Sequence, residues 1–311
     1  MALELEGVST ELYEKIVNRR SFVKGFGLAG IGVAAAGLSA CNSSTMAMAA
    51  TSTSATADTA QQIFTAALIA EGLAITMYYN ALVGGVIQDP NLAGSGGTAL
   101  KVTSSGSVSN VAYLQGALSE EIQHANLLRS LVAPSGSASG DPVQTFYFPT
   151  GTFDNLQNFF PIVNALETAF IGAYMTAVQE FALMIGNVSP YSSTQASATA
   201  GTNYTTAQLA AFAKISASIL GVEAEHRTLA RAIPPPGMFA GVSVTPSDNL
   251  CYESNASLTD VYNDKGTSAV AALTPFLSAS SSNPVGFSYA TALAGSTALI
   301  ASYGCTGMPP S

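Results

Sequence analysis

The feature that most constrains this chain is the placement of its only two histidines. His124 and His226 each follow a glutamate, Glu121 or Glu223, by three residues. On an α-helix, residues three apart project from the same face, so a carboxylate and an imidazole at this spacing can hold one ion together. Both pairs are therefore predicted to lie on helices and to bind metal.

Two further glutamates, Glu71 and Glu167, stand alone in apolar stretches that read as helical, with no lysine or arginine close by. An unpaired carboxylate inside an apolar bundle is costly, so each is expected to be protonated, paired or bound to a cation. Either one, taken alone, could be a protonated core residue. Taken with the two histidine pairs, they complete a set of four carboxylates and two imidazoles, whose charge balances two divalent ions.

The order Glu, Glu-x-x-His, Glu, Glu-x-x-His over four helices resembles the ferritin-like superfamily of di-iron and di-manganese carboxylate proteins. The resemblance implies an all-α fold: a ferritin-like four-helix bundle with a long crossover between its second and third helices, and here extra C-terminal helices. It implies two divalent metal ions, iron or manganese. The implied ligands are Glu71, Glu121, His124, Glu167, Glu223 and His226.

Within that superfamily, the chain is most similar to an exported branch that includes plant desiccation-related proteins and fungal stress-associated relatives. The similarity covers residues 58–233, and the tail more loosely. It implies a protein that handles peroxide or dioxygen or oxidises ferrous iron, as ferroxidases, peroxidases, oxygenases and manganese catalases do. Two alternatives stay open: a metal-binding or storage protein without turnover, and a structural stress protein.

Apolar periodicity and turn residues predict the four helices at residues 59–86, 108–132, 155–185 and 205–233. The connection 133–154 contains a short β-like run at 145–148. It is long enough to cross the length of a bundle, as ferritin-like folds require between their second and third helices.

The two halves of this region repeat weakly. Tyr78 and Tyr174 follow Glu71 and Glu167 by seven residues, and Arg129 and Arg231 follow His124 and His226 by five. The tyrosines are predicted on the metal-facing sides of their helices, as hydrogen-bond donors, radical traps or simple core residues. The arginines are predicted to balance the helix dipoles.

Glu120 and Glu225 adjoin the predicted ligands in the sequence. Successive residues on a helix are rotated by about 100° around its axis. Both side chains are therefore expected at the surface or beside the ligands, and not among them.

Residues 1–41 look like a twin-arginine export signal with a lipobox. Arg19 and Arg20 precede an apolar run at 25–40, and Cys41 follows this run directly. This predicts export to the periplasm or cell envelope, with a lipid on Cys41 and a flexible tether at 42–57. An ordinary positively charged leader stays open, as does cleavage near Ala49 to give a soluble exported protein.

Residues 234–311 are predicted to form a C-terminal helical cap, with helices near 268–278 and 289–303. In an oxidising compartment Cys251 and Cys305 are expected to pair, and two unpaired thiols are the alternative.

The charge balance limits the partners. Only 9% of the residues are charged and the net charge is −9, whereas nucleic-acid binding needs clustered Lys and Arg. The expected partners are peroxide, dioxygen or ferrous iron, with membrane contact only through a lipid anchor, and a homo-oligomer stays open.

Overall fold

The computed structural model describes residues 58–97, 99, 110–189, 191–234 and 273–300. The chain divides into two units, Met1–Ala57 and Asp58–Ser311, and all described residues belong to the second. The predicted signal peptide with Cys41 and the tether at 42–57 lie outside the described residues. Cys251 and Cys305 do so as well, and their pairing stays a prediction.

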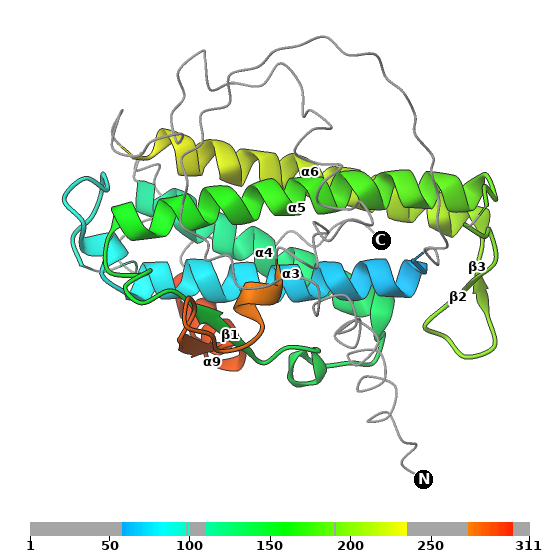
Figure 1. The fold of residues 1–311 in the computed structure, drawn as a ribbon, viewed down its shortest axis with the longest axis horizontal. Coiled ribbons are helices and arrows are strands. Elements are labelled where there is room, and N and C mark those ends of the chain that lie inside the picture. The colour runs from blue at the N-terminus through cyan, green and yellow to red at the C-terminus, as the bar shows by residue number, and fades with distance from the viewer. Residues whose placement is uncertain (1–57, 98, 100–109, 190, 235–272, 301–311) are drawn as a thin grey trace. The chain divides into compact units, whose positions relative to one another are not determined.

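Helices dominate the described chain, which confirms the all-α class (Figure 1). Four long helices lie side by side and are called the bundle below. They begin and end within three residues of the predicted positions. Their bounds are Ala60–Val83 for α3, Asn110–Val132 for α4, Leu156–Ile185 for α5 and Thr206–Ala232 for α6.

Side-chain caps explain where these helices begin. The Thr59 hydroxyl accepts a hydrogen bond from the backbone N–H of Gln62, and the Gln62 side-chain oxygen in turn accepts one from the backbone N–H of Thr59. Thr205 and Gln208 repeat this arrangement at the start of α6. Such a capping box satisfies two backbone donors that the first helical turn leaves unpaired. Asn155 caps α5 in a simpler way.

The bundle packs as two helix pairs, with α5 along α6 and α3 along α4. Apolar side chains fill the space between the pairs. Near the N-terminal end of α3, for example, the ring of Phe64 packs against those of Phe181 and Phe212, with centroids 5.2 and 4.9 Å away.

Two helices of the bundle, α3 and α5, have the length and apolar composition of a membrane span. In α3, however, 72% of the most apolar window is buried inside the fold, and in α5 50% is buried. A core helix of a folded bundle has the same properties.

Two hydrogen bonds place the long connection between α4 and α5. The side chain of Gln61, at the start of α3, donates to the carbonyl of Val132 at the end of α4, at 2.7 Å. The backbone N–H of Gly85, just beyond α3, donates to the carbonyl of Phe153, at 2.8 Å. Residues 133–153 therefore run from the N-terminal end of α3 to its C-terminal end.

The predicted β-like run in this connection is strand β1, Thr145–Phe148. It pairs antiparallel with β4, Val285–Ser288, with Thr145 opposite Ser288 and Phe148 opposite Val285. The partner strand was not predicted from the sequence. It is followed directly by α9, Tyr289–Ile300, which packs on α3 and α4 and agrees with the predicted C-terminal helix over its described part.

The remaining elements are short. They are the 3-10 turns η1 (Val86–Gln88), η3 (Ala138–Gly140) and η4 (Thr274–Phe276), and a hairpin of β2 (Gln195–Ala196) with β3 (Asn203–Tyr204). Of the helix predicted at 268–278, residues 268–272 lie outside the described ranges. In the rest, Leu273 is helical and Thr274–Phe276 form the 3-10 turn η4, so the helical structure ends two residues before the predicted residue 278.

Arg129 makes contacts beyond the predicted interaction with the helix dipole. It lies in the last turn of α4, as expected, but its guanidinium forms two hydrogen bonds with Asp141, at 2.8 and 2.6 Å. The hydroxyl of Tyr289 contacts both partners, at 2.9 Å from Arg129 and 3.0 Å from Asp141. This network joins α4, the long connection and α9. Arg231 lies in the last turn of α6 as predicted.

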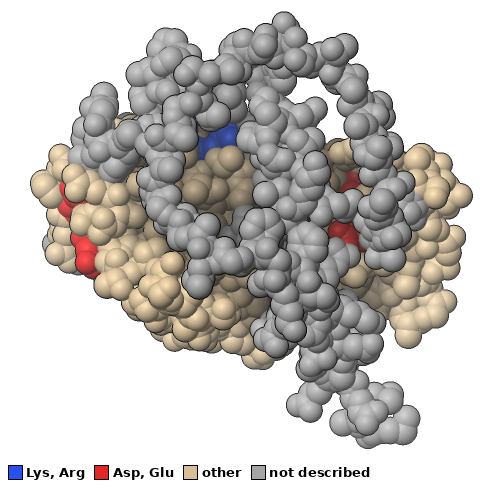
Figure 2. Space-filling model, viewed as in Figure 1, with Lys and Arg blue, Asp and Glu red and all other residues tan. Residues whose placement is uncertain are grey.

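The face of the molecule in Figure 2 carries few charged side chains among the described residues. This agrees with the low charged fraction of the sequence.

Candidate metal centre

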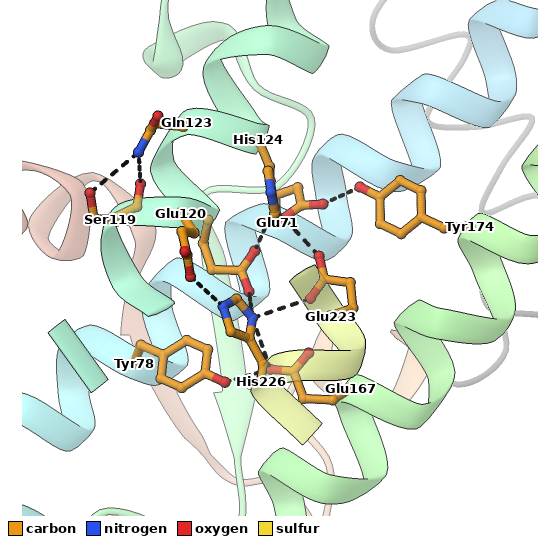
Figure 3. Close-up of polar contacts among 11 residues, drawn as sticks. Glu71, Tyr78, Ser119, Glu120, Gln123, His124, Glu167, Tyr174, Glu223 and His226 are labelled. Atoms are coloured by element: carbon orange, nitrogen blue, oxygen red, sulfur yellow. Dashed lines mark hydrogen bonds and ion pairs between the residues drawn. The ribbon is translucent and has the colours of Figure 1, made fainter. Parts of the chain in front are cut away.

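All six predicted ligands meet inside the bundle. Glu71 comes from α3, Glu121 and His124 from α4, Glu167 from α5, and Glu223 and His226 from α6 (Figure 3). The five side chains other than His124 are at most 2% exposed, and that of His124 is 11% exposed. Four helices thus bring four carboxylates and two imidazoles into one nearly closed space.

One group surrounds His124. Its Nδ1 atom lies 3.4 Å from an oxygen of each of three carboxylates, Glu71, Glu121 and Glu223. The four donor atoms lie within 4.8 Å of one another and could hold a metal ion.

The second group surrounds His226. Its Nδ1 atom lies 3.0 Å from Glu121 Oε1, 3.4 Å from Glu223 Oε2 and 3.9 Å from Glu167 Oε1. These four donor atoms also lie within 4.8 Å of one another.

Glu121 and Glu223 belong to both groups. Glu121 presents Oε2 to His124 and Oε1 to His226, and Glu223 presents Oε1 to His124 and Oε2 to His226. Each carboxylate therefore faces both imidazoles, whereas Glu71 belongs only to the His124 group and Glu167 only to the His226 group.

The donor spacing suits a metal ion. Nitrogen and oxygen ligands lie about 2.0–2.2 Å from a divalent first-row ion, which places two adjacent ligands roughly 3.0–3.4 Å apart. The contacts of both Nδ1 atoms with Glu121 and Glu223 fall in this range.

The same atoms lack other partners. Among the described residues, no hydrogen-bond partner is found for Nδ1 of either histidine or for either oxygen of Glu121 and Glu223. One oxygen of Glu167 is also without a partner. Buried polar atoms are rarely left unpaired. A cluster of unpaired nitrogen and oxygen donors that face one another is the arrangement a cation would satisfy.

Two tyrosines hold the outer carboxylates. The hydroxyl of Tyr78 on α3 donates to Glu167 on α5 at 2.6 Å, and the hydroxyl of Tyr174 on α5 donates to Glu71 on α3 (Figure 3). Both tyrosines are buried. Of the roles considered for them, the structure supports that of hydrogen-bond donors.

Glu120 and Glu225 differ in their surroundings. Glu120 Oε2 lies 2.8 Å from Nε2 of His226, although 44% of the Glu120 side chain is exposed. A carboxylate on the far nitrogen fixes the orientation of the ring and leaves Nδ1 free to bind a metal. Glu225 is exposed. Glu120 therefore lies beside the ligands and Glu225 at the surface, the two positions foreseen for this pair.

Burial and mutual repulsion make the centre hold protons when no cation is present. Burial, together with the Glu121 carboxylate, raises the pKa of Glu71 well above its usual range. Burial and the Glu223 carboxylate do the same to the pKa of Glu167. For Glu121, burial alone would raise the pKa, but its contacts with Glu71 and the histidines outweigh it and lower the pKa.

The histidines respond in the opposite sense to burial. Burial acts to lower the pKa of His124, yet the Glu71 charge and the contact with Glu121 raise it well above the ordinary value. For His226 the contacts with Glu120 and Glu121 have the same effect on the pKa. Metal ligands must be deprotonated, so a bound cation would replace these protons.

Comparisons with known proteins identify no relative. No protein-family model, no curated protein and no solved structure matches this chain. The functional argument therefore rests on the chain's own residues.

Proposed function

We propose that this chain is an exported protein of the ferritin-like superfamily. In this proposal it binds two divalent ions, iron or manganese, and uses them in a redox reaction with dioxygen or peroxide or to oxidise ferrous iron.

The course of the helices supports the ferritin-like part of this proposal. α4 ends beside the start of α3, and α5 begins beside the end of α3, because residues 133–153 run along the bundle. Tyr204, just before α6, approaches Gln61 and the carbonyl of Leu131. The helices α3 and α6 therefore run in one direction, and α4 and α5 in the other. A long crossover between the second and third helices is a property of ferritin-like folds.

The observation that carries the metal proposal is the position of Glu121 and Glu223, each facing both His124 and His226. A carboxylate with one oxygen toward each of two donor groups is suited to bridge two ions. With Glu71 and Glu167 as the outer ligands, four carboxylates would neutralise two divalent ions. Each ion would then receive one imidazole, one outer carboxylate and two shared carboxylates.

The ions would supply the electron transfer, and the protein residues would control their surroundings. Tyr78 and Tyr174 hold the outer carboxylates in place through hydrogen bonds. Burial raises the pKa of both phenols, and the charges of Glu167 and Glu71 raise it further, so both remain neutral donors. Among the six candidate ligands, only His124 is exposed to more than 2%, so water would reach the ions mainly past its imidazole.

Elemental analysis of purified full-length protein tests the metal proposal. We expect two iron or manganese ions per chain, and a loss of at least half of this metal in Glu223→Ala, since that carboxylate belongs to both donor groups. Glu225→Ala is the matched control, because it removes an exposed glutamate from the same helix and should keep the full metal content. Full metal content in Glu223→Ala would exclude the assigned ligands.

Turnover is tested separately on the metal-loaded protein. We expect the protein either to consume oxygen when ferrous iron is added or to release oxygen from peroxide. Whichever reaction the wild-type protein shows should be lost in Glu223→Ala. Stoichiometric metal without either reaction would favour a binding, storage or structural role.

The export proposal rests on Arg19, Arg20 and Cys41. We expect the mature chain in the membrane fraction outside the cytoplasm, and Cys41→Ser in the soluble exported fraction. Substitution of both arginines by lysine should retain the precursor in the cytoplasm. A cytoplasmic wild-type chain would contradict the proposal.

A further inference from the structure

A small apolar pocket opens between α3 and α5, next to the metal centre. It offers about 20 Å³ to the centre of a water-sized molecule. About 10–15 Å³ of such space holds one water molecule, so the pocket takes an occupant of one or two heavy atoms. Six of the residues that line it are alanines: Ala66, Ala67, Ala70, Ala169, Ala173 and Ala177.

The pocket has an outer and an inner side. Ala67 and Ala173 are half-buried, whereas Ala70 and Tyr174 are buried. Tyr174 is also the residue whose hydroxyl donates to Glu71 (Figure 3), and Ala70 directly precedes Glu71 in α3. The inner wall of the pocket is therefore one side chain away from a predicted metal ligand.

One polar group in the wall is left without a partner. Ser216 on α6 is 0% exposed, and its hydroxyl has no hydrogen-bond partner within the described part of the chain. Among the described lining residues, the one other hydroxyl is that of Tyr174, which is already bonded to Glu71. An ordered water needs two to four polar partners, and the described lining offers it only the Ser216 hydroxyl.

On these grounds we propose that the pocket binds dioxygen and is its route to the metal centre, with the Tyr174 ring between the pocket and Glu71. This inference rests on the proposed function and narrows it, since it selects dioxygen over peroxide as the oxidant. Dioxygen is a small apolar molecule that gives up almost no hydrogen bonding when it leaves water. The single free hydroxyl of the described lining, that of Ser216, is enough to contact it. Peroxide would leave most of its hydrogen-bonding groups unpaired among the alanines.

The binding step is tested on metal-free, full-length protein with isotopically labelled alanine methyl groups. Dissolved dioxygen is paramagnetic and accelerates the relaxation of nearby methyl protons. Under oxygen pressure relative to nitrogen, we expect the relaxation of Ala70 and Ala177, both buried in the pocket wall, to increase several-fold more than that of Ala74 and Ala81. The latter are 0% exposed core alanines of α3 outside the pocket. Equal increases in both sets would overturn the inference whatever the metal content.

A filling substitution tests the route. Ala67→Leu should abolish the excess relaxation at Ala70 and slow oxygen-dependent oxidation of the ferrous-loaded protein at least about tenfold, with metal content unchanged. Ala182→Leu adds the same side chain at an exposed site of α5 and should change neither. Wild-type oxidation rates in Ala67→Leu would exclude the pocket as the route. Absence of redox-active metal would instead contradict the proposed function, and the relaxation measurement would still decide the binding step.

Discussion

The hydroxyl of Tyr78 lies 2.6 Å from the carboxylate of Glu167 and joins α3 to α5 across the bundle. Tyr174 and Glu71 form the reverse contact, from α5 back to α3. The weak sequence repeat, a tyrosine seven residues after each lone glutamate, therefore produces a reciprocal pair of contacts. Each tyrosine supports the carboxylate of the opposite half.

Tyr78→Phe should weaken metal retention while keeping the fold. The ring still packs, but Glu167 loses its neutral donor, and loss of such a supporting contact costs about tenfold or more in metal affinity. A chelator competition assay measures this. Tyr113→Phe is the control, because Tyr113 is 49% exposed on α4. Equal retention in the two variants would show that the Tyr78 hydroxyl does not support a ligand.

Glu120→Gln should weaken the His226 half of the centre in particular. The variant keeps the size of the side chain but removes the charge that faces Nε2 of His226. We expect about a 10- to 100-fold loss of affinity for the ion in the His226 group. Metal titration followed by calorimetry measures it, with Glu225→Gln on α6 as the exposed control. A change shared equally by both variants would indicate a general effect of surface charge.

The buried carboxyl of Glu180, outside the metal centre, should make the stability of the fold depend on pH. Burial first, and then the charge of Asp58, raise the pKa of Glu180 to about 8, although a hydrogen bond from Tyr191 acts to lower it. In the unfolded chain the pKa of a glutamate is about 4.3. Between about pH 4 and 8 the unfolded chain gives up this proton first, so the folded state loses stability as the pH rises through that window.

Glu180→Gln should therefore have no effect near pH 4. At pH 8.5 it should increase the free energy of unfolding by on the order of 5 kcal/mol, since each pH unit between the two pKa values is worth about 1.36 kcal/mol. Urea unfolding at the two pH values measures the difference. A variant that is no more stable than wild type at pH 8.5 would show that the Glu180 carboxylate ionises without penalty.

Loss of one partner of the Arg129–Asp141 pair should destabilise the fold, and a second substitution that removes the other charge should restore part of the stability. Both side chains are at least 91% buried, and removal of one partner leaves a buried charge unpaired. Arg129→Met should lower the free energy of unfolding by about 3 kcal/mol. The double variant with Asp141→Leu should recover part of this loss, because both charges are then absent. Losses that simply add would show that the two groups do not interact.

Local rules account for much of what was predicted correctly. Each capping box spans only four consecutive residues, Thr59–Gln62 or Thr205–Gln208. Because the signal is local, α3 and α6 begin where the sequence predicts. Glu121 with His124 and Glu223 with His226 share a helix face because of helical periodicity alone. The apolar surroundings of Glu71 and Glu167 could also be predicted from the sequence, because their neighbours along the helix are apolar.

Other features depend on residues far apart in the chain. The residues that pair between β1 and β4 are 137 to 143 positions apart, from Phe148 with Val285 to Thr145 with Ser288, and the short sequence of β4 contains no signal that identifies its partner. Arg129 was assigned to the helix dipole because Asp141 and Tyr289 approach it only in the folded chain. Glu120 on α4 contacts His226 on α6. The rotation of residues about a single helix axis cannot predict a contact between two helices.

By itself, the sequence determined the helical class, the helix limits and the six candidate ligands, because capping and helical periodicity act over a few residues. Only the tertiary structure decided that Glu121 and Glu223 face both histidines and that a pocket lies behind Tyr174. Those relations depend on how four separate helices rotate and pack against one another, and that packing is a property of the whole bundle.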